Sequence, residues 1–357
     1  MKYQLSNLKY HLPNFSLFLT SNKITMKKYA SLLLFALLLN GCDDGDLTVD
    51  TIDFDEVASA SCDPLTNTLI YKLKPQESLL LNMPEGKILD EPTTVDAPLT
   101  YDIDNINYRV FYRAYDGTVA KENICGSIPP KTPNVTEEWI ATAGKIEIAT
   151  NAIYKDPAPA DGHTEIVGYN HNIVFRNITF LKPAGPQVEA EYVFGDYQTV
   201  VTPVVVTFLE PENAKYCDVL RKVYNNNTAN SLVIENLDKS LIVNEATPVG
   251  KPRTSVVNLN GNTNNLFYRT YNGNLPAPTN INYYCLENTP TSPTVKDTWV
   301  GEAGVANVSG IIEVTTTNSL NVFKHQVVLK NVTLKKGNSS FKLASNFVLG
   351  TVTTITQ

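Results

Sequence analysis

Phe111-Tyr-Arg-Ala-Tyr-Asp-Gly117 occurs a second time in this chain, as Phe267-Tyr-Arg-Thr-Tyr-Asn-Gly273. Four more matches keep the same order along the two halves: Cys62-Asp63 with Cys217-Asp218, Trp139-Ile-Ala-Thr-Ala-Gly144 with Trp299-Val-Gly-Glu-Ala-Gly304, His171–Phe180 with His325–Leu334, and Val193-Phe-Gly195 with Val348-Leu-Gly350. Ordered self-similarity of this kind is the sign of a duplicated structural unit. The matches predict two tandem copies, repeat 1 over residues 47–201 and repeat 2 over residues 202–357.

Both copies have the period of strands rather than of helices. Segments such as Tyr108 to Tyr115 and Asn172 to Phe180 are short, rich in β-branched and aromatic residues, and separated by Pro, Gly, Asn or Asp. Asp116-Gly117 and Asn272-Gly273 follow strong strand patterns and predict tight type I′ hairpins. The fold class is therefore all-β, with two tandem β-sandwich domains of jelly-roll or immunoglobulin-like form. The strand order is left open.

One strand pattern changes face partway along. The apolar residues of 173–175 alternate onto one face, whereas those of 178–180 fall on the opposite face. One extra residue between them would return all the apolar side chains to the same side of the sheet. The sequence therefore predicts a β-bulge at Arg176-Asn177 and another at Lys330-Asn331 in the second copy.

The start of the chain has the pattern of an export signal. From Met26, two lysines precede an apolar run from Ala30 to Leu39, and Cys42 follows soon after. A basic segment, an apolar core of about ten residues and a small residue at the cut describe a secretory signal peptide. The run is about half the length that a membrane-spanning helix needs. We assign the signal peptide to residues 26–41 and interpret residues 1–25 as the product of a mis-chosen start codon.

The end of this signal resembles the lipobox of bacterial lipoproteins. Leu39, Gly41 and Cys42 fit that motif, with Asn40 where Ala or Ser is usual. The acidic residues of 42–46, directly behind the cysteine, are similar to the export signal of Bacteroidota-type outer-membrane lipoproteins. The resemblance implies lipidation at Cys42, a signal peptide that is removed, and an acidic tether over residues 42–46. It also implies a lipid-anchored protein of the outer membrane at the cell surface, with the periplasmic face as the alternative.

Composition limits the choice of partners. Residues 1–41 contain five lysines and no acidic residue, so the exported chain has a formal charge of −12. Nucleic acids and anionic lipid surfaces are bound by clustered Lys and Arg. The charge therefore argues against a nucleic-acid partner, and the expected attachment to membrane is through the lipid alone.

The remaining four cysteines predict two disulfides. An even number of cysteines in an exported protein favours disulfide pairing, and none of the four forms the CxxC or CxxH pair of a zinc site. Equivalence under the repeat selects one pairing within each copy: Cys62–Cys125 and Cys217–Cys285.

The sequence contains no motif that would predict catalysis. His171 and His325 are a duplicated pair in isolated strand positions, and no GxSxG nucleophile motif is present. The paired acids Asp102 and Asp104 are absent from the second copy, and Glu147 lies alone among apolar residues. We therefore predict no catalytic residue, no cofactor and no metal, and expect His171 to have a structural or surface role.

The expected function is a surface-displayed, lipid-anchored and non-catalytic binding or structural module. Two alternatives stay open: an enzyme that processes extracellular polysaccharide or protein at the cleft between domains, and an accessory subunit of an outer-membrane assembly. The partner would be a glycan or a protein, and the oligomeric state is left open. For a glycan the candidate contacts are Tyr112 and Tyr268, because they lie opposite the face formed by Phe111, Arg113 and Tyr115.

Overall fold

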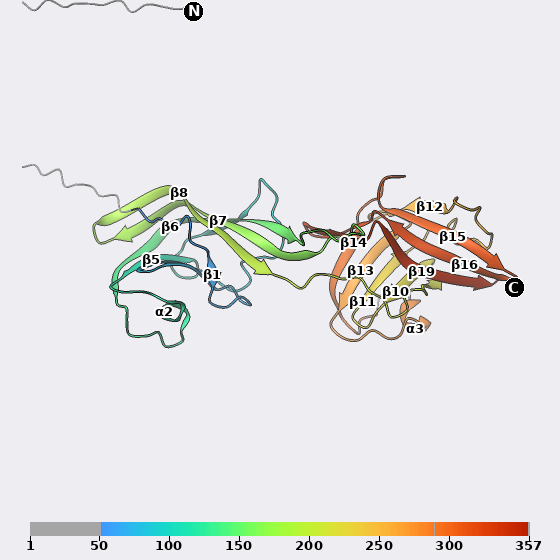
Figure 1. Ribbon diagram of the computed structural model, residues 1–357, viewed down its shortest axis with the longest axis horizontal. Helices are drawn as coiled ribbons and strands as arrows, with labels where there is room; N and C mark the ends of the chain where they lie inside the picture. Colours follow the sequence, from blue (N-terminus) through green and yellow to red (C-terminus); the bar gives the residue numbers. More distant parts are fainter. Residues whose placement is uncertain (1–50, 289, 356–357) are drawn as a thin grey trace, which may run out of the picture. The chain divides into compact units, whose positions relative to one another are not determined.

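The computed structural model describes residues 51–355 except residue 289, and these residues form an all-β protein with antiparallel sheets (Figure 1). Residues 1–50, which include the expected signal peptide, Cys42 and the acidic tether, lie outside the described residues. None of the helices in the described part of the chain is long and apolar enough to cross a membrane.

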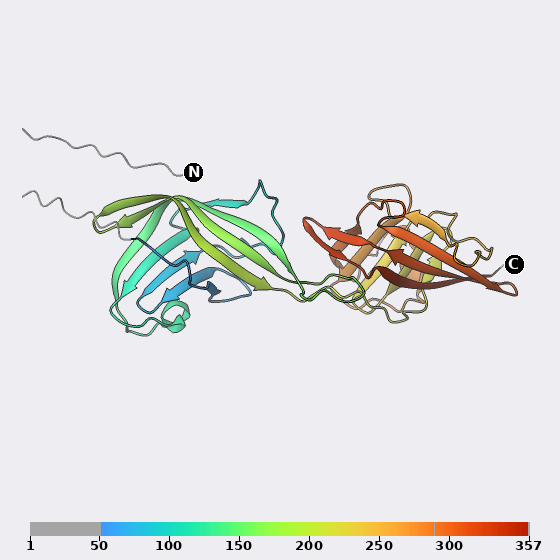
Figure 2. The same cartoon turned by 45° about the horizontal axis from the view of Figure 1, so that its top comes forward.

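The first half forms one eight-stranded sheet in the order β1-β2-β3-β5-β6-β7-β8, with β4 pairing with β6. Its elements are β1 (Ala60–Ser61), β2 (Leu69–Lys74), β3 (Glu77–Asn82), β4 (Leu99–Asp102), β5 (Arg109–Tyr115), α2 (Lys121–Cys125), β6 (Val135–Tyr154), β7 (Ile166–Lys182) and β8 (Gly185–Val200). The strands β6, β7 and β8 are long and bent, as the turned view shows (Figure 2).

A glycine allows β6 to belong to both layers of the sandwich. The first part of β6 pairs with β5 and its later part pairs with β4. Gly144, between these two parts, has a φ of +126°, and a Cβ there would lie 2.8 Å from the Cα of Ile178. Only glycine adopts this conformation readily and leaves room for so close a neighbour. The sequence therefore bends the strand at this residue.

The second half has two sheets, one of seven strands in the order β18-β17-β14-β13-β11-β10-β9 and one of four in the order β12-β15-β16-β19. Its elements are β9 (Lys215–Cys217), β10 (Lys222–Asn226), β11 (Asn230–Glu235), β12 (Arg253–Val256), β13 (Asn265–Tyr271), α3 (Ile281–Tyr284), β14 (Val295–Gly301), β15 (Ile311–Ser319), β16 (Val322–Lys330), β17 (Thr333–Lys336), β18 (Ser339–Lys342) and β19 (Asn346–Ile355). Alternate side chains of both sheets point inward and form the core, among them Leu232, Ile234, Leu266, Val314 and Leu329.

The bulge expected in β7 is present. Lys145 pairs with Arg176 and Ala143 with Thr179, so two residues of β7, Asn177 and Ile178, lie opposite one residue of β6, Gly144. Asn177 takes up the extra residue with a φ of +48°. The apolar side chains on both sides of it are fully buried: Ile173, Phe175, Ile178 and Phe180.

In the second half the same position is a gap between two strands instead of a bulge. Strand β16 ends at Lys330 and β17 begins at Thr333, while Asn331 has a φ of +50°. The consequence for the side chains is the same, because Val327 and Val332 on either side of the gap are both fully buried.

The tight hairpins predicted at Asp116-Gly117 and Asn272-Gly273 are wrong. Strand β5 does pair with β6, but residues 116–134 lie between them and include α2. The side chain of Asp116 accepts hydrogen bonds from the backbone N–H and the side-chain amide of Asn134, at 2.8 and 2.7 Å. The aspartate therefore closes the base of a long loop, and its position before glycine imitates a turn signal.

Both predicted disulfides are confirmed. Cys62 is bonded to Cys125 and Cys217 to Cys285, with Cα–Cα distances of 5.3 and 5.4 Å. In each half the second cysteine lies at the end of a short helix, α2 or α3. Each disulfide therefore fixes a long loop against the outer face of the sheet that begins with β1 or β9.

Candidate functional site

Each half of the chain has a histidine at the centre of a buried hydrogen-bond network. In repeat 1, Nδ1 of His171 lies 3.0 Å from Oγ1 of Thr150, and Nε2 lies 3.1 Å from Oγ1 of Thr199. The Thr199 hydroxyl donates in turn to the carboxylate of Asp90, at 2.5 Å. His171 has no exposed surface.

Repeat 2 has the same network with one exchange. Nδ1 of His325 lies 2.9 Å from Oγ1 of Thr316 and Nε2 lies 2.8 Å from Oγ1 of Thr354, whose hydroxyl donates to the side-chain oxygen of Asn244. Asn244 takes the place that Asp90 has in repeat 1. Arg253 donates to the Thr316 hydroxyl at 2.9 Å.

These contacts define which tautomer each ring adopts when it is neutral. A hydroxyl has one proton to donate, and Thr199 and Thr354 each give theirs to the side chain beyond. They therefore accept a hydrogen bond from Nε2–H of the histidine, and Nδ1 accepts one from the other threonine. The lone pair that a general base or a metal ligand needs is already engaged in both repeats.

The network affects the charges around it. Burial raises the pKa of Asp90, but hydrogen bonds from His171 and Thr199 more than offset this and hold the pKa below its usual value. Burial and, to a smaller extent, the nearby charge of Arg253 together lower the pKa of His325 to about 4. His325 is therefore neutral at physiological pH, and its hydrogen bonds support the interior of the fold.

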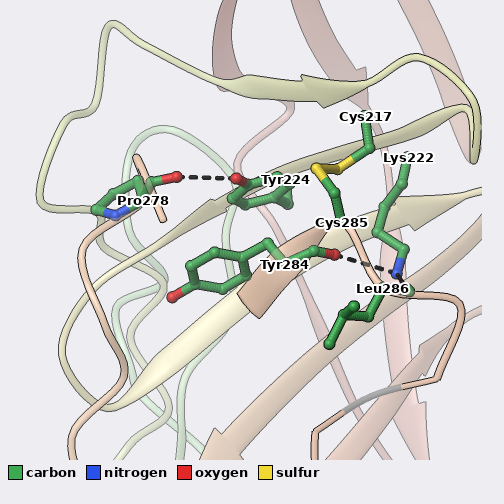
Figure 3. Close-up of a disulfide and its surroundings, with 7 residues drawn as sticks. All are labelled: Cys217, Lys222, Tyr224, Pro278, Tyr284, Cys285 and Leu286. Carbon is green, nitrogen blue, oxygen red and sulfur yellow. Dashed lines mark hydrogen bonds between the residues drawn. A yellow bond between two sulfur atoms is a disulfide. The ribbon is translucent and has the colours of Figure 1, made fainter. Parts of the chain in front are cut away.

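Tyrosines and a lysine surround the second disulfide on the outer face of the sheet (Figure 3). The ammonium group of Lys222 donates to the backbone oxygens of Tyr284 and Leu286, at 3.3 and 2.7 Å. The ring of Tyr224 stacks on Tyr284 with 4.4 Å between the ring centres, and its hydroxyl donates to the backbone oxygen of Pro278. Burial lowers the pKa of Lys222, yet its ammonium group already donates to backbone carbonyls at the end of α3 and just beyond it. We interpret this lysine as a clamp for the disulfide loop.

The outer face also contains a phenylalanine and an arginine from each of two strands: Phe111 and Arg113 from β5, and Phe267 and Arg269 from β13. The guanidinium of Arg113 lies over Phe111 and that of Arg269 over Phe267, 5.6 and 4.4 Å from the ring centres. Each half therefore contains a cation–π pair between an arginine and a phenylalanine two residues before it.

The structure places Tyr112 and Tyr268 in the interior, where they cannot act as exposed ligand contacts. Only 8% of Tyr112 and 2% of Tyr268 is exposed. The ring of Tyr112 packs on Trp139 with 4.6 Å between ring centres, and Tyr268 lies edge-on to Phe341. A sugar-binding ring must present a flat open face. The prediction that these two residues contact a glycan is therefore not retained.

The remaining acidic residues considered from the sequence are engaged within the fold. The carboxylate of Asp104 accepts hydrogen bonds from three successive backbone N–H groups, which hold the pKa at about 2, and Asp102 is paired with Lys145. Glu147 accepts a hydrogen bond from Arg176 at 2.8 Å. In the described part of the chain, no group of three or more His, Cys, Asp or Glu residues is placed to hold a metal ion.

An open groove lies at the edge of repeat 2, between strands β9 and β19. Its volume is about 720 Å³. Its walls are formed by 213–216 with Asp218 and by 351–355, and its remaining lining comes from Ile242, Asn244 and Ile281. Sequence reasoning missed this groove because its walls come from segments that are far apart in the chain. Neither segment contains a motif that would mark it.

Comparison with known proteins adds no relative. The chain matches no protein-family model, no curated protein sequence and no solved structure.

Proposed function

We propose that this protein is a surface-displayed lipoprotein, anchored through Cys42, whose two β-sandwich repeats serve as a non-catalytic binding module. The anchor rests on the sequence of residues 26–46. The proposal that the repeats are non-catalytic rests on their buried histidines. Both ring nitrogens of each histidine are hydrogen-bonded to threonines of the same repeat, so neither nitrogen is available as a general base.

The two halves share features that support descent from one domain. Tyr112 pairs with Trp139 across β5 and β6, and Tyr268 pairs with Trp299 across β13 and β14. In both pairs of strands the register shifts just before the final tyrosine of the motif. The disulfides and histidine networks correspond as well. A binding module keeps its copies alike, whereas an active site would draw polar residues into one copy.

The anchor is tested by metabolic labelling with a palmitate analogue. The wild type should take up the label and Cys42→Ser should not. Protease added to intact cells should digest the wild type, which is anchored, and should not digest Cys42→Ser. Label retained by Cys42→Ser would overturn the anchor, and resistance to the protease would move the protein to the periplasmic face.

The absence of catalysis is tested with substrates. The purified full chain is incubated with a panel of extracellular polysaccharides and unfolded proteins, alongside His171→Gln and His325→Gln. No product is expected from any of the three proteins. Product release by the wild type that is lost in either variant would establish an enzyme and contradict the proposal. No observation on the described residues favours the accessory-subunit alternative over the binding module.

A further inference from the structure

Side chains from one end of repeat 1 pack into repeat 2. The hydroxyl of Tyr154 donates to the backbone oxygen of Ser340 at 2.9 Å. The hydroxyl of Tyr169 lies 3.0 Å from that of Ser339. Tyr169 also belongs, with Ile166, to the buried apolar cluster that forms the core of repeat 2. Repeat 1 therefore completes the core of repeat 2, and the contact between them is part of the fold.

The loop beside this contact is an insertion in repeat 1. Strand β6 ends at Tyr154 and β7 begins at Ile166, so residues 155–165 connect them. In repeat 2 the equivalent strand β15 ends at Ser319 and β16 begins at Val322. The sandwich itself does not need the longer loop, because repeat 2 forms the same pair of strands with a tight turn.

Backbone hydrogen bonds fix this loop to residues 339–345 of repeat 2, and the two segments together are called the joint. The N–H of Thr164 donates to the carbonyl of Lys342, whose own N–H donates to Oγ1 of Thr164, at 3.1 and 2.8 Å. The N–H of Ser345 donates to the carbonyl of Asp161 at 2.8 Å. The N–H of Leu343, between them, donates instead to a carbonyl of repeat 2 itself, at 2.9 Å.

His163 ties the loop together from its middle. Nδ1 of the ring lies 2.5 Å from the carboxylate of Asp161, and Nε2 lies 2.9 Å from that of Glu165. An ionised carboxylate only accepts hydrogen bonds, so both ring nitrogens carry a proton and the ring is positively charged in this arrangement. Lys155 adds a second positive charge, 3.1 Å from both oxygens of Glu165. Positive and negative groups thus alternate along the loop and hold its shape.

The charges around the ring favour its protonated form. The hydrogen bond to Glu165 raises the pKa of His163 above the ordinary value of 6.5, burial opposes this, and Asp161 raises the pKa further. Hydrogen bonds from the ring hold the pKa of both carboxyl groups below their usual values. Of the described residues of repeat 2 that line the cavity beside the ring, Lys342 is the charged one, and its side chain is exposed. The carboxylates of the loop itself therefore control the charge of the ring.

We propose that loop 155–165 is a proton-operated latch: while His163 is protonated the loop joins the two repeats, and when the ring loses its proton the joint opens. A neutral ring keeps one N–H, so its other nitrogen presents a lone pair to a carboxylate and one bond becomes a repulsion.

The direction of the pH dependence follows from the raised pKa of the ring. A group whose pKa is raised in the joined state binds its proton more tightly there. The contribution of the latch is therefore complete below pH 6.5 and is lost as the pH rises through the raised value. This inference goes beyond the proposed binding function and does not rest on it, because neither the labelling of Cys42 nor the substrate panel tests the joint.

The test is amide hydrogen exchange of the full chain, measured by NMR between pH 6.5 and pH 9 and corrected for the intrinsic effect of pH on exchange. Protection of the Lys342 and Ser345 amides should fall about fivefold across this range, as for the loss of a partly exposed, charged hydrogen bond. Protection of the Leu343 amide, which is bonded within repeat 2, should stay constant. His325 does not interfere, because burial lowers its pKa to about 4, below this range.

Three variants show whether the ring is responsible. His163→Gln has no proton to lose, so protection of the Lys342 and Ser345 amides should no longer depend on pH. Glu165→Gln removes the group that most raises the pKa of the ring, so the fall in protection should move to lower pH. Asp156→Asn removes an exposed carboxylate from the same loop and is the matched control, which should behave as wild type.

The proposal is overturned by any of three results. Equal pH dependence in wild type and His163→Gln would assign the loss of protection to other groups. A parallel fall at Leu343 would show that repeat 2 loosens as a whole and that the joint is not the part that opens. A nitrogen-15 spectrum with one proton on the His163 ring at pH 6 would show that the ring is neutral where the latch requires it to be charged.

Discussion

Repeat 2 should be the acid-sensitive part of the protein, because it buries a neutral histidine without a carboxylate. The perturbation is a fall in pH, compared between wild type, His325→Gln and Asn244→Asp. The last variant gives repeat 2 the acid that repeat 1 has at Asp90, whose carboxylate lies 3.4 Å from Nε2 of His171.

The magnitude follows from the pKa of His325. Burial lowers it to about 4 from an ordinary value of 6.5. A group with a depressed pKa in the folded state binds protons more readily when unfolded. Its contribution is therefore complete above pH 6.5, declines as the pH falls below that value, and is lost once the pH passes below 4. The loss should reach at most about 3 kcal/mol of the free energy of unfolding.

The assay is urea unfolding between pH 7.5 and pH 4, followed by tryptophan fluorescence. The chain has one tryptophan per repeat, Trp139 and Trp299, so a Trp139→Phe background reports on repeat 2 alone. The His325→Gln variant serves as the reference that removes contributions from carboxylates. The free energy of unfolding, taken relative to that of His325→Gln at the same pH, should fall as the pH falls in the wild type. It should fall less in Asn244→Asp. An equal slope in wild type and His325→Gln would refute the reasoning that burial controls this histidine.

Three other predictions concern stability and are read from urea unfolding. Removing the second disulfide with Cys217→Ala and Cys285→Ala should cost about 4 kcal/mol for a loop of this length, and a loss below about 1 kcal/mol would contradict the chain-entropy account. Gly350→Ala should destabilise by about 2 kcal/mol more than Gly185→Ala, because both glycines have positive φ but only Gly350 has backbone within contact distance; equal losses would show that φ alone matters. Tyr268→Ala should cost about 3 kcal/mol as a core truncation, and a loss typical of a surface residue would reopen its role as a ligand contact.

The sequence predicted those features that depend on a repeated or periodic pattern. The disulfide partners follow from equivalence between copies, which selects Cys62–Cys125 and Cys217–Cys285 without any knowledge of the strand order. The bulge at Asn177 follows from a change in apolar alternation, because burial on one face is a strong constraint on register.

Features that depend on distant segments were not predictable from local pattern. Alternation shows that Tyr112 and Phe111 lie on opposite faces, but it does not show that both faces are covered. The disulfide loop that contains α2 covers the outer face, so Phe111 is 6% exposed. On the opposite face Tyr112 packs on Trp139 and is 8% exposed. The hairpin prediction at Asp116 failed for the same reason, because its partner Asn134 lies 18 residues further along the chain.

The histidine networks join residues that nothing in the sequence connects. Asp90 and Thr199 are 109 residues apart, and neither lies in a matched motif. A comparison of the copies residue by residue around the matched histidines would have found them, since Thr199 and Thr354 occupy the same place beside the ring.

The two halves differ at the position next to the histidine network. The inward-facing tyrosine, tryptophan and histidine are the same in both halves, but Asp90 of the first half is replaced by Asn244 in the second. The carboxylate of Asp90 lies 3.4 Å from Nε2 of His171, whereas Asn244 offers His325 no negative charge. The exchange therefore removes the nearby acid that would stabilise a protonated ring, and this is why the acid sensitivity is expected in the second half rather than in the first.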